Sequence, residues 1–342
     1  MGLRNRPTGL QPADPARRLL DQLFDRPTAA GGEPPVNALK SRPTRRALLV
    51  AGAGTALTAG LTGGTAAAAA PAASRNGHEV TRRLRALERE HSARLGVYAR
   101  NLATGATVLH RTDERFPVCS LFKTLAAAAV LRDLDRSGEF LAKVVHYTED
   151  ELDKTWSPVT GLPENLEHGM TVDELCHAAI TRSDNSAGNF LLRELGGPGA
   201  ITRFCRSIGD DRTRLDRWEP ELNSAEPWQW KDTTSPGAIG RTYARLVVGD
   251  VLEPHDRERL TGWLLANTTS GEQFRKGLPA DWTVADKTGA GGYGTTNNAG
   301  VAWTPDGAPV ALAVLTTKFH QDAGNDRALV AGTAELLAGA LG

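Results

Sequence analysis

The sequence contains few of the residues that disulfide frameworks and metal sites need. Only three of its 342 residues are cysteines, Cys119, Cys176 and Cys205, and an odd number cannot pair completely within one chain. One disulfide would fit this count, but the pattern favours three small, buried side chains. The eight histidines show no H-E-x-x-H spacing and no pairing with the cysteines, so we expect no metal site and no cofactor.

An excess of charge of either sign is also missing, because Lys plus Arg and Asp plus Glu each number 40. The charge is uneven along the chain: residues 1–72 hold nine basic and four acidic side chains, a net of +5, which leaves −5 on the remainder. A mildly acidic body without a clustered basic face argues against nucleic-acid binding. With 40% hydrophobic and 23% charged residues, the composition is typical of a globular protein with a sizeable core.

No apolar run has the length and hydrophobicity of a membrane span. The run over residues 47–61 is diluted by glycine and threonine, so we expect no stable membrane anchor. It follows a twin-arginine pair at 45–46 and precedes an A-x-A cleavage pattern at 70–72. We therefore predict that residues 1–72 are an N-terminal extension and signal peptide, and that the protein is secreted by twin-arginine-type export. The alternative is a disordered Ala/Gly tail.

Hydrophobic periodicity divides the remainder into helical and strand segments. The predicted helices cover residues 78–92, 171–180, 185–195, 235–249 and 325–341, and the predicted strands cover 95–101, 105–111, 282–287, 299–303 and 309–317. This order predicts an α+β fold whose α/β part is built from both chain ends, with an all-helical part between them. The predicted boundaries are 73–117 and 264–342 for the α/β part and 118–263 for the helical part.

Ser120 and Lys123 form an S-x-x-K pattern at the start of an alanine-rich run. On a helix, side chains three residues apart share a face, so the ammonium would lie one turn from the hydroxyl. A helix N-terminus favours negative charge developing on a serine oxygen, and a neighbouring amine can activate that oxygen as a nucleophile. Alone the pattern is weak, since it arises by chance roughly once in a few hundred residues.

Ser183 and Asn185 enclose Asp184 in a second polar motif. The hydroxyl can pass a proton to a leaving nitrogen, and the amide can orient Lys123 and an acyl-amide substrate. The same three residue types are also common in ordinary turns.

Lys287, Thr288 and Gly289 follow a strand predicted over 282–286. The ammonium and the hydroxyl can hold a carboxylate, while Gly289 and the small Ala290 let a ligand lie close to the backbone. An edge strand at this place could also bind a substrate amide as an added strand. Taken alone, the tripeptide is more often a surface lysine before a turn.

A fourth stretch contains Arg217, Glu219, Asn223 and Asp232. A Glu and an Asn four residues apart can hold one water between them. Arg217 and Asp232 can join the two ends of the loop as an ion pair. By itself, such a Glu is more often a solvated surface charge.

Together and in this order, the four motifs resemble those of the class A β-lactamases, and the resemblance extends from about residue 79 to 341. Trp156 matches a position at the rim of that family's pocket. The resemblance implies a β-lactamase/transpeptidase-like fold, with an antiparallel sheet flanked by helices and an all-helical domain. It also implies a serine hydrolase that opens the ring of a small-molecule β-lactam. We expect the enzyme to be a monomer.

The resemblance assigns roles in acylation. Ser120 would attack the lactam carbonyl, and the backbone N–H groups of Ser120 and Ala290 would form the oxyanion hole. Ser183 would pass a proton to the lactam nitrogen. The base that activates the serine would be either Lys123 or Glu219 acting through a water, and the resemblance leaves both open.

It also assigns roles in binding and product release. Glu219 and Asn223 would activate the water that releases the product, and Asn185 would help to organise the proton network. Lys287 and Thr288 would hold the substrate carboxylate.

The carboxylate site departs from the family pattern. The family often carries an arginine on the strand after the Lys-Thr-Gly motif or on a neighbouring element. Thr296 and Gln273 occupy the aligned positions here, and Arg275 is close by in the sequence. We therefore expect weaker binding of the substrate carboxylate.

Two other functions share part of this pattern. A D,D-peptidase of the penicillin-binding family has the Ser120, Ser183 and Lys287 motifs, but the loop with Glu219 argues against it, because only fast deacylation requires an activated water. A β-lactam sensor would be acylated once. Such modules usually adjoin a membrane span, and the sequence has no second apolar run of that length.

Overall fold

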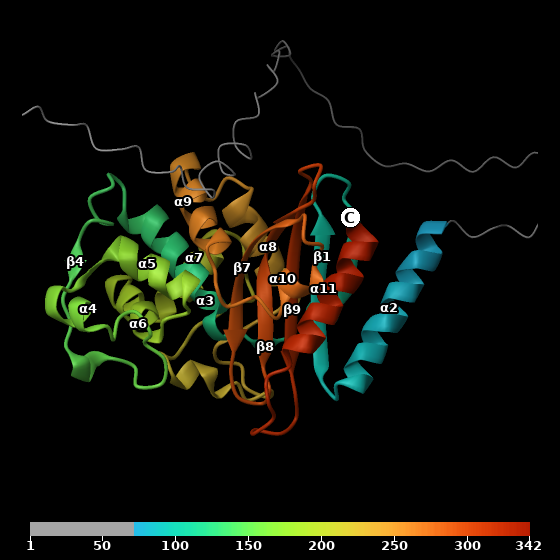
Figure 1. The fold of residues 1–342 in the computed structure, drawn as a ribbon, viewed down its shortest axis with the longest axis horizontal. Helices are drawn as coiled ribbons and strands as arrows, with labels where there is room; N and C mark the ends of the chain where they lie inside the picture. Colours follow the sequence, from blue (N-terminus) through green and yellow to red (C-terminus); the bar gives the residue numbers. More distant parts are fainter. Residues whose placement is uncertain (1–71) are drawn as a thin grey trace, which may run out of the picture.

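The computed structural model of the protein describes residues 72–342. Nearly all of the predicted leader, residues 1–72, lies outside the described residues, and the first described helix begins at Ala72. Helices lie on both faces of one main sheet (Figure 1). Within this part of the chain, no helix combines the length and the apolar character that crossing a bilayer requires.

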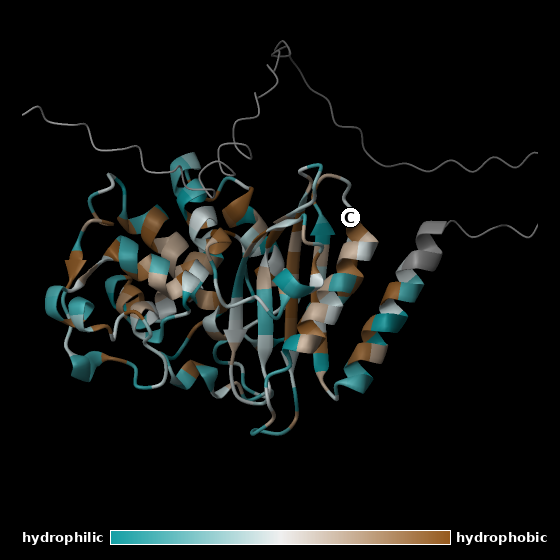
Figure 2. Cartoon of the chain, viewed as in Figure 1, coloured by the Kyte–Doolittle hydropathy of each residue, from teal (hydrophilic) through white to brown (hydrophobic). Residues whose placement is uncertain are grey.

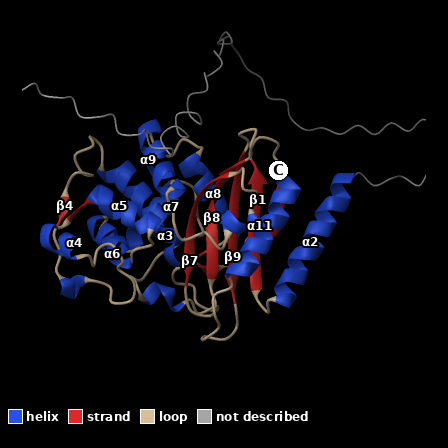
Figure 3. Cartoon of the chain, in the orientation of Figure 1, coloured by secondary structure: helices blue, strands red, loops and turns tan. Residues whose placement is uncertain are grey.

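The main sheet has five strands in the order β2-β1-β9-β8-β7, and each neighbouring pair is antiparallel. The strands are β1 (Arg94–Asn101), β2 (Thr107–His110), β7 (Thr283–Ala290), β8 (Thr296–Trp303) and β9 (Pro309–Thr317). Strand β1 pairs along its whole length with β9, so the two ends of the described chain meet in one sheet (Figure 3). This confirms the predicted fold class, an antiparallel sheet built from both chain ends and flanked by helices.

The outer face of the sheet is covered by α2 (Ala72–Glu90), α10 (Phe274–Gly277) and α11 (Arg327–Leu341). Leu84 of α2 is completely buried in the apolar core on this side. Val310, Leu312 and Val314 of β9 face the same core, because alternate residues of a strand point to one face of the sheet. This core is distinct from the larger one on the inner face.

The inner face is covered by α8 (Pro236–Val247) and α9 (Pro254–Leu265). Beyond them lie α3 (Phe122–Ala129), α4 (Pro163–His168), α5 (Val172–Thr181), α6 (Asn185–Glu194) and α7 (Gly199–Ser207). One apolar core runs from the sheet's inner face into these helices. Helix α3 is buried along its whole length, whereas the helices around it carry both apolar and polar residues, as expected for helices with one buried side (Figure 2).

Short elements complete the chain. They are β3 (Phe116–Pro117), β4 (Val144–Val145), β5 (Met170–Thr171), β6 (Thr233–Thr234), η1 (Cys119–Leu121), η2 (Val130–Leu134), η3 (Glu149–Glu151) and η4 (Glu221–Ser224). Pairing of β3 with β6 ties the segment before Ser120 to the segment before α8.

Local capping explains where several helices begin. Helix α5 starts with a capping box in which Thr171 Oγ1 accepts from the backbone N–H of Glu174, and the Glu174 carboxylate accepts from the backbone N–H of Thr171. Asp184 caps α6 by accepting from the backbone N–H of Ala187, and Ser235 caps α8 by accepting from that of Ala238, with Pro236 favouring the first turn of α8. The sequence predicted all three of these helix starts to within one residue.

The predicted end of the strand before the Lys-Thr-Gly motif is wrong. Strand β7 does not stop at Asp286; it continues to Ala290, because β8 pairs with it residue by residue as far as Ala290 opposite Thr296. Lys287 and Thr288 therefore point to opposite faces of the sheet. Strand β7 lies at the edge of the sheet, since it is the last strand in the order.

Gly240 provides a test of the packing between α8 and the sheet. A Cβ atom at Gly240 would overlap the ring of Tyr98 on β1, which is buried. We expect Gly240→Ala to destabilise the protein by about 1–3 kcal/mol through overpacking. In a thermal melt this corresponds to a fall of roughly 2–4 °C for each kcal/mol.

The matched control is Gly332→Ala on α11, where a Cβ atom would meet nothing within 4 Å. Alanine there should leave the melting temperature unchanged or raise it, because alanine favours a helix by about 1 kcal/mol over glycine. Equal melting temperatures for the two variants would contradict the packing described.

Candidate active site

Ser120 lies in η1, between the edge of the sheet and the helical part. Its turn is fixed from two sides: the backbone N–H of Val118 donates to Asp232 O (2.8 Å), and the hydroxyl of Tyr243 donates to Leu121 O (3.0 Å). Cys119 immediately before it has φ of 44°, a left-handed conformation that a residue with a side chain keeps only when its surroundings hold it. The serine is thus presented at a defined, strained turn.

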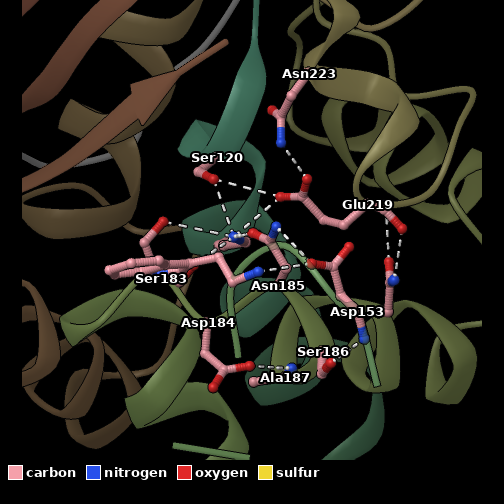
Figure 4. Close-up of polar contacts among 12 residues, drawn as sticks. Ser120, Asp153, Ser183, Asp184, Asn185, Ser186, Ala187, Glu219 and Asn223 are labelled. Atoms are coloured by element: carbon pink, nitrogen blue, oxygen red, sulfur yellow. Dashed lines mark hydrogen bonds and ion pairs between the residues drawn. The ribbon is translucent and has the colours of Figure 1, made fainter. Parts of the chain in front are cut away.

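Lys123 places a buried ammonium beside this serine. Its Nζ donates to Ser120 Oγ (2.9 Å), to Asn185 Oδ1 (2.7 Å) and to the backbone O of Ser183 (2.8 Å). The side chain is completely buried, and its charge is paired with the Glu219 carboxylate at 3.0 Å. Figure 4 shows Ser120, Ser183, Asn185 and Glu219 converging on one point. Because a buried charge is costly unless it is paired and hydrogen-bonded, this group of acceptors fixes the ammonium.

Ser183 stands between two lysines. Its Oγ accepts from Lys287 Nζ at 3.0 Å and lies 3.5 Å from Lys123 Nζ. Its φ of 56° is again left-handed. Burial, followed by the nearby Lys123 ammonium, holds the pKa of Lys287 well below its usual value.

Glu219 lies beside the Ser120 hydroxyl. Its Oε1 is 3.4 Å from Ser120 Oγ, and the side-chain amide of Asn223 donates to its Oε2. The residue is 3% exposed. The carboxylate that the sequence placed on a loop is therefore part of the buried polar cluster and not a solvated surface charge.

The two ends of the loop carrying Glu219 are joined by Arg217 and Asp232. Arg217 Nε lies 2.5 Å from Asp232 Oδ2, and Asp232 Oδ1 also accepts from the backbone N–H of Asp216 and of Arg217. Arg217 Nη1 donates to Ser224 Oγ (2.9 Å). The predicted ion pair is present, and it closes the loop at its base.

Strand β7 runs close beside the nucleophile. A Cβ atom at Gly289 would lie 3.2 Å from Cys119 Cβ and 3.4 Å from the backbone N of Ser120, so a side chain there would push the two backbones apart by a few tenths of an ångström. Ala290 follows on the strand. The backbone of β7 and the amide of Ser120 therefore face a common space.

Two further predicted residues lie at the edges of this space. Trp156 is exposed, its Nε1 donates to Arg182 O (3.0 Å), and its own carbonyl accepts from the backbone N–H of Asn185 (2.9 Å). Thr288 Oγ1 is 2.5 Å from Thr269 Oγ1. The tryptophan ring is thus exposed beside Arg182, and its backbone helps to hold Asn185.

Asn189 contributes to the site, and sequence reasoning missed it. Its Nδ2 donates to Glu219 O (2.9 Å), and its Oδ1 accepts from the backbone N–H of Glu219 (3.0 Å). Asn189 is four residues after Asn185 on α6, so both amides project from one helix face. The four-residue spacing from Asn185 was the sequence signal that could have identified Asn189 as a site residue.

Asp153 is a second residue that the sequence did not single out. Its Oδ1 accepts from Asn185 Nδ2 (3.3 Å) and from the backbone N–H groups of Thr155 and Trp156. Burial alone would raise the pKa of Asp153, but these hydrogen bonds and that from the Thr155 hydroxyl lower it below the usual value. The Asp153 carboxylate therefore holds the side-chain amide of Asn185, and this amide accepts a hydrogen bond from Lys123.

The structure shows what Arg275 does near the predicted carboxylate site. Its guanidinium donates to Ser270 Oγ (2.8 Å) and to Val284 O (3.1 Å), and it lies 3.3 Å from Asp286 Oδ1. These partners hold the Arg275 guanidinium beside Asp286. Gln273 is buried, and its Oε1 has no hydrogen-bond partner.

Within residues 72–342, no cluster of three or more His, Cys, Asp or Glu side chains is arranged to hold a metal ion. The three cysteines are free and buried, and burial raises the pKa of each thiol. None of them offers an activated thiolate.

Comparison with known proteins agrees with this geometry. Residues 79–338 match the β-lactamase enzyme family. A β-lactamase of Streptomyces lavendulae is 67% identical over 303 residues, which cover 88% of this chain and 98% of the relative. The β-lactamase of Streptomyces fradiae is 64% identical over 304 residues, 88% of this chain and 98% of the relative.

Solved structures give the same result. The β-lactamase from Streptomyces albus G has a TM-score of 0.76 and 62% identity, covering 77% of this chain and all of that one (100%). A variant of the last common ancestor of Gram-negative class A β-lactamases has a TM-score of 0.73 and 49% identity, covering 77% of this chain and 98% of that one. The chain therefore belongs to the β-lactamase enzyme family, as a serine β-lactamase with the class A fold that hydrolyses β-lactams.

Proposed function

We propose that Ser120 is the acylated nucleophile and that Glu219 activates the water that releases the product. The observation that carries this proposal is the position of the Lys123 ammonium, which contacts Ser120 Oγ at 2.9 Å and the Glu219 carboxylate at 3.0 Å. One buried cation thus links the group that forms the acyl-enzyme to the group that breaks it.

In acylation, Ser120 Oγ adds to the lactam carbonyl and loses its proton. Both candidate bases are close: Lys123 Nζ at 2.9 Å, which would take this proton in its neutral amine form, and Glu219 Oε1 at 3.4 Å, which would act through a water. The backbone N–H groups of Ser120 and Ala290 would stabilise the oxyanion. Ser183 lies between the two lysines and would hand a proton to the lactam nitrogen as the C–N bond breaks.

In deacylation, the Glu219 carboxylate would take a proton from the attacking water. Asn223 contacts one carboxylate oxygen, and Asn189 holds the Glu219 backbone through two hydrogen bonds. A base held in this way needs little reorganisation when the water attacks.

Lys287 and Thr288 are proposed to bind the substrate carboxylate, and Asn185 the acyl amide. Trp156 would border the pocket. No arginine from position 273 or 296 assists, because these are Gln273 and Thr296. The positive charge that attracts the substrate carboxylate would therefore come from Lys287.

We further propose that residues 1–72 are an export leader of the twin-arginine type and that the mature protein is a secreted monomer. The supporting sequence features are the arginine pair, the diluted apolar run and the A-x-A pattern. We propose the same functional division of the mature chain as above, with 118–263 as the helical part and 73–117 with 264–342 as the α/β part.

A D,D-peptidase or a one-time β-lactam sensor would share Ser120, Lys123 and Lys287. The buried Glu219 within 3.4 Å of Ser120 Oγ favours the hydrolase, because neither alternative needs a base that activates water.

The mechanism predicts different failures for two variants of residues 73–342. Glu219→Ala should acylate and then stall, with turnover of a chromogenic cephalosporin reduced about 100- to 10,000-fold, the usual contribution of a general base. Ser120→Ala should give neither burst nor turnover. Stopped-flow absorbance separates the two, and mass spectrometry should find the acyl adduct only where Ser120 is present. A single stoichiometric acylation by the wild type would overturn the proposed deacylation.

The missing arginine predicts a gain-of-function change. Gln273→Arg should lower KM for carboxylate-bearing β-lactams about 10- to 100-fold, because a charge-assisted hydrogen bond contributes roughly 1.5–3 kcal/mol. Steady-state kinetics measure the effect. A β-lactam with its carboxylate esterified is the control, and an equal gain on that ester would contradict the explanation.

The lowered pKa of Lys287 predicts a loss of substrate affinity in alkali. As pH rises through a folded-state pKa well below 10.5, Lys287 becomes neutral and its attraction for the substrate carboxylate disappears. KM should therefore rise on the alkaline side, before pH 10.5. Lys287→Arg stays charged and should flatten this limb. The opposite sign holds for stability, which should increase with pH over the same window, since the unfolded chain keeps the proton longer.

A further inference from the structure

Two segments that carry different parts of the active site touch through the rings of Trp228 and Tyr293. Trp228 lies in the loop that also carries Glu219, and Tyr293 lies in the turn after Ala290. The ring centroids are 5.3 Å apart with planes at 82°. This is the edge-to-face arrangement that aromatic pairs prefer.

Backbone contacts lie directly beside this pair. The N–H of Gly292 donates to Asn223 O at 2.8 Å. A Cβ atom at Gly291 would lie 2.7 Å from the same Asn223 oxygen and 3.1 Å from Ala225 Cβ. The loop and the turn therefore meet without a side chain between them. We call the group formed by Asn223, Trp228, Gly292 and Tyr293 the loop–turn contact.

Tyr293 is the fixed partner in this contact. It is 7% exposed, its N–H donates to Gln321 O (3.1 Å), and its carbonyl accepts from the N–H of Lys318 (2.6 Å). Its φ of 56° is left-handed, a conformation that persists in a tyrosine only when neighbours hold it. The turn is thus anchored to the body of the protein independently of the loop.

Trp228 is the partner that the contact restrains. It is 67% exposed, so it adds little to the apolar core. The loop is closed at its base by Arg217 and Asp232, and Trp228, four residues before Asp232, packs on Tyr293. We therefore expect the ring pair to restrain the position of the loop and to contribute little to the stability of the fold.

We propose that Trp228 is a positioning residue for deacylation. By packing on Tyr293 it holds the loop against the turn, and so keeps Asn223 and Glu219 aligned on the acyl-enzyme. Acylation depends less on this contact, because Lys123 keeps three hydrogen bonds to acceptors outside the loop, on Ser120, Ser183 and Asn185. The inference rests on the proposed role of Glu219 in releasing the product.

Separate rate constants test the proposal. Trp228→Ala should lower the deacylation rate constant about 2- to 10-fold, the range expected for losing one aromatic pair, and lower the acylation rate constant by less than that. Trp228→Phe retains a ring edge and should restore most of the loss. Stopped-flow measurements with a chromogenic cephalosporin give both constants, and thermal melts should show no change for either variant.

Trp230→Ala is the matched control. Trp230 is 65% exposed in the same loop, but its ring faces the Arg115 guanidinium at 4.6 Å and makes no ring contact with Tyr293. This variant should keep both rate constants. In a double-mutant cycle, adding Tyr293→Ala to Trp228→Ala should cause less than the sum of the two single effects.

Three outcomes would overturn the role of Trp228: equal deacylation by the Trp228→Ala variant and the wild type, equal losses in acylation and deacylation, or additive effects in the cycle. Failure of the proposed function is a separate result, because it would appear as absent turnover in the wild-type protein.

Discussion

The buried ammonium of Lys123 is the interaction on which the rest of the site depends. It is surrounded by oxygens of Ser120, Asn185, Ser183 and Glu219, which come from three separate segments of the chain. A cation in so dry a place is stable only while each acceptor stays in position. The same requirement that stabilises the charge therefore holds Ser120, Asn185 and Glu219, the proposed nucleophile, amide and general base, at fixed distances.

The site lies where the sheet meets the helical part. The helices contribute side chains, and the sheet contributes an edge strand whose backbone lies close to Ser120. The helices present side chains from fixed faces, as α6 does with Asn185 and Asn189. Strand β7 contributes a backbone that can approach the serine closely, because Gly289 has no Cβ. Glu219 sits on an irregular loop. An ion pair joins the two ends of this loop, and further contacts hold it against the turn after Ala290.

Much of the fold and the site could be predicted because the signals were local. The capping box at Thr171 needs only residues three apart, and the strands of the sheet show clear apolar patterns. The sequence did not resolve helices such as α7 and α9. It also ended β7 too early, because the continuation depends on β8, a partner that local patterns do not show. Asn189 and Asp153 were missed for the same reason: their partners, Glu219 and Asn185, are distant in the sequence.

The sequence by itself determined the identities and order of the reactive groups, since S-x-x-K, the Ser183 and Lys287 motifs and the loop with Glu219 are short and carry their chemistry in residue type. Only the tertiary structure decided which charges are buried, that Arg275 is occupied by Asp286, and that Ser183 stands between two lysines. The physical reason is that burial and electrostatic coupling depend on distances between segments far apart in the chain, and those distances are set by packing in the core.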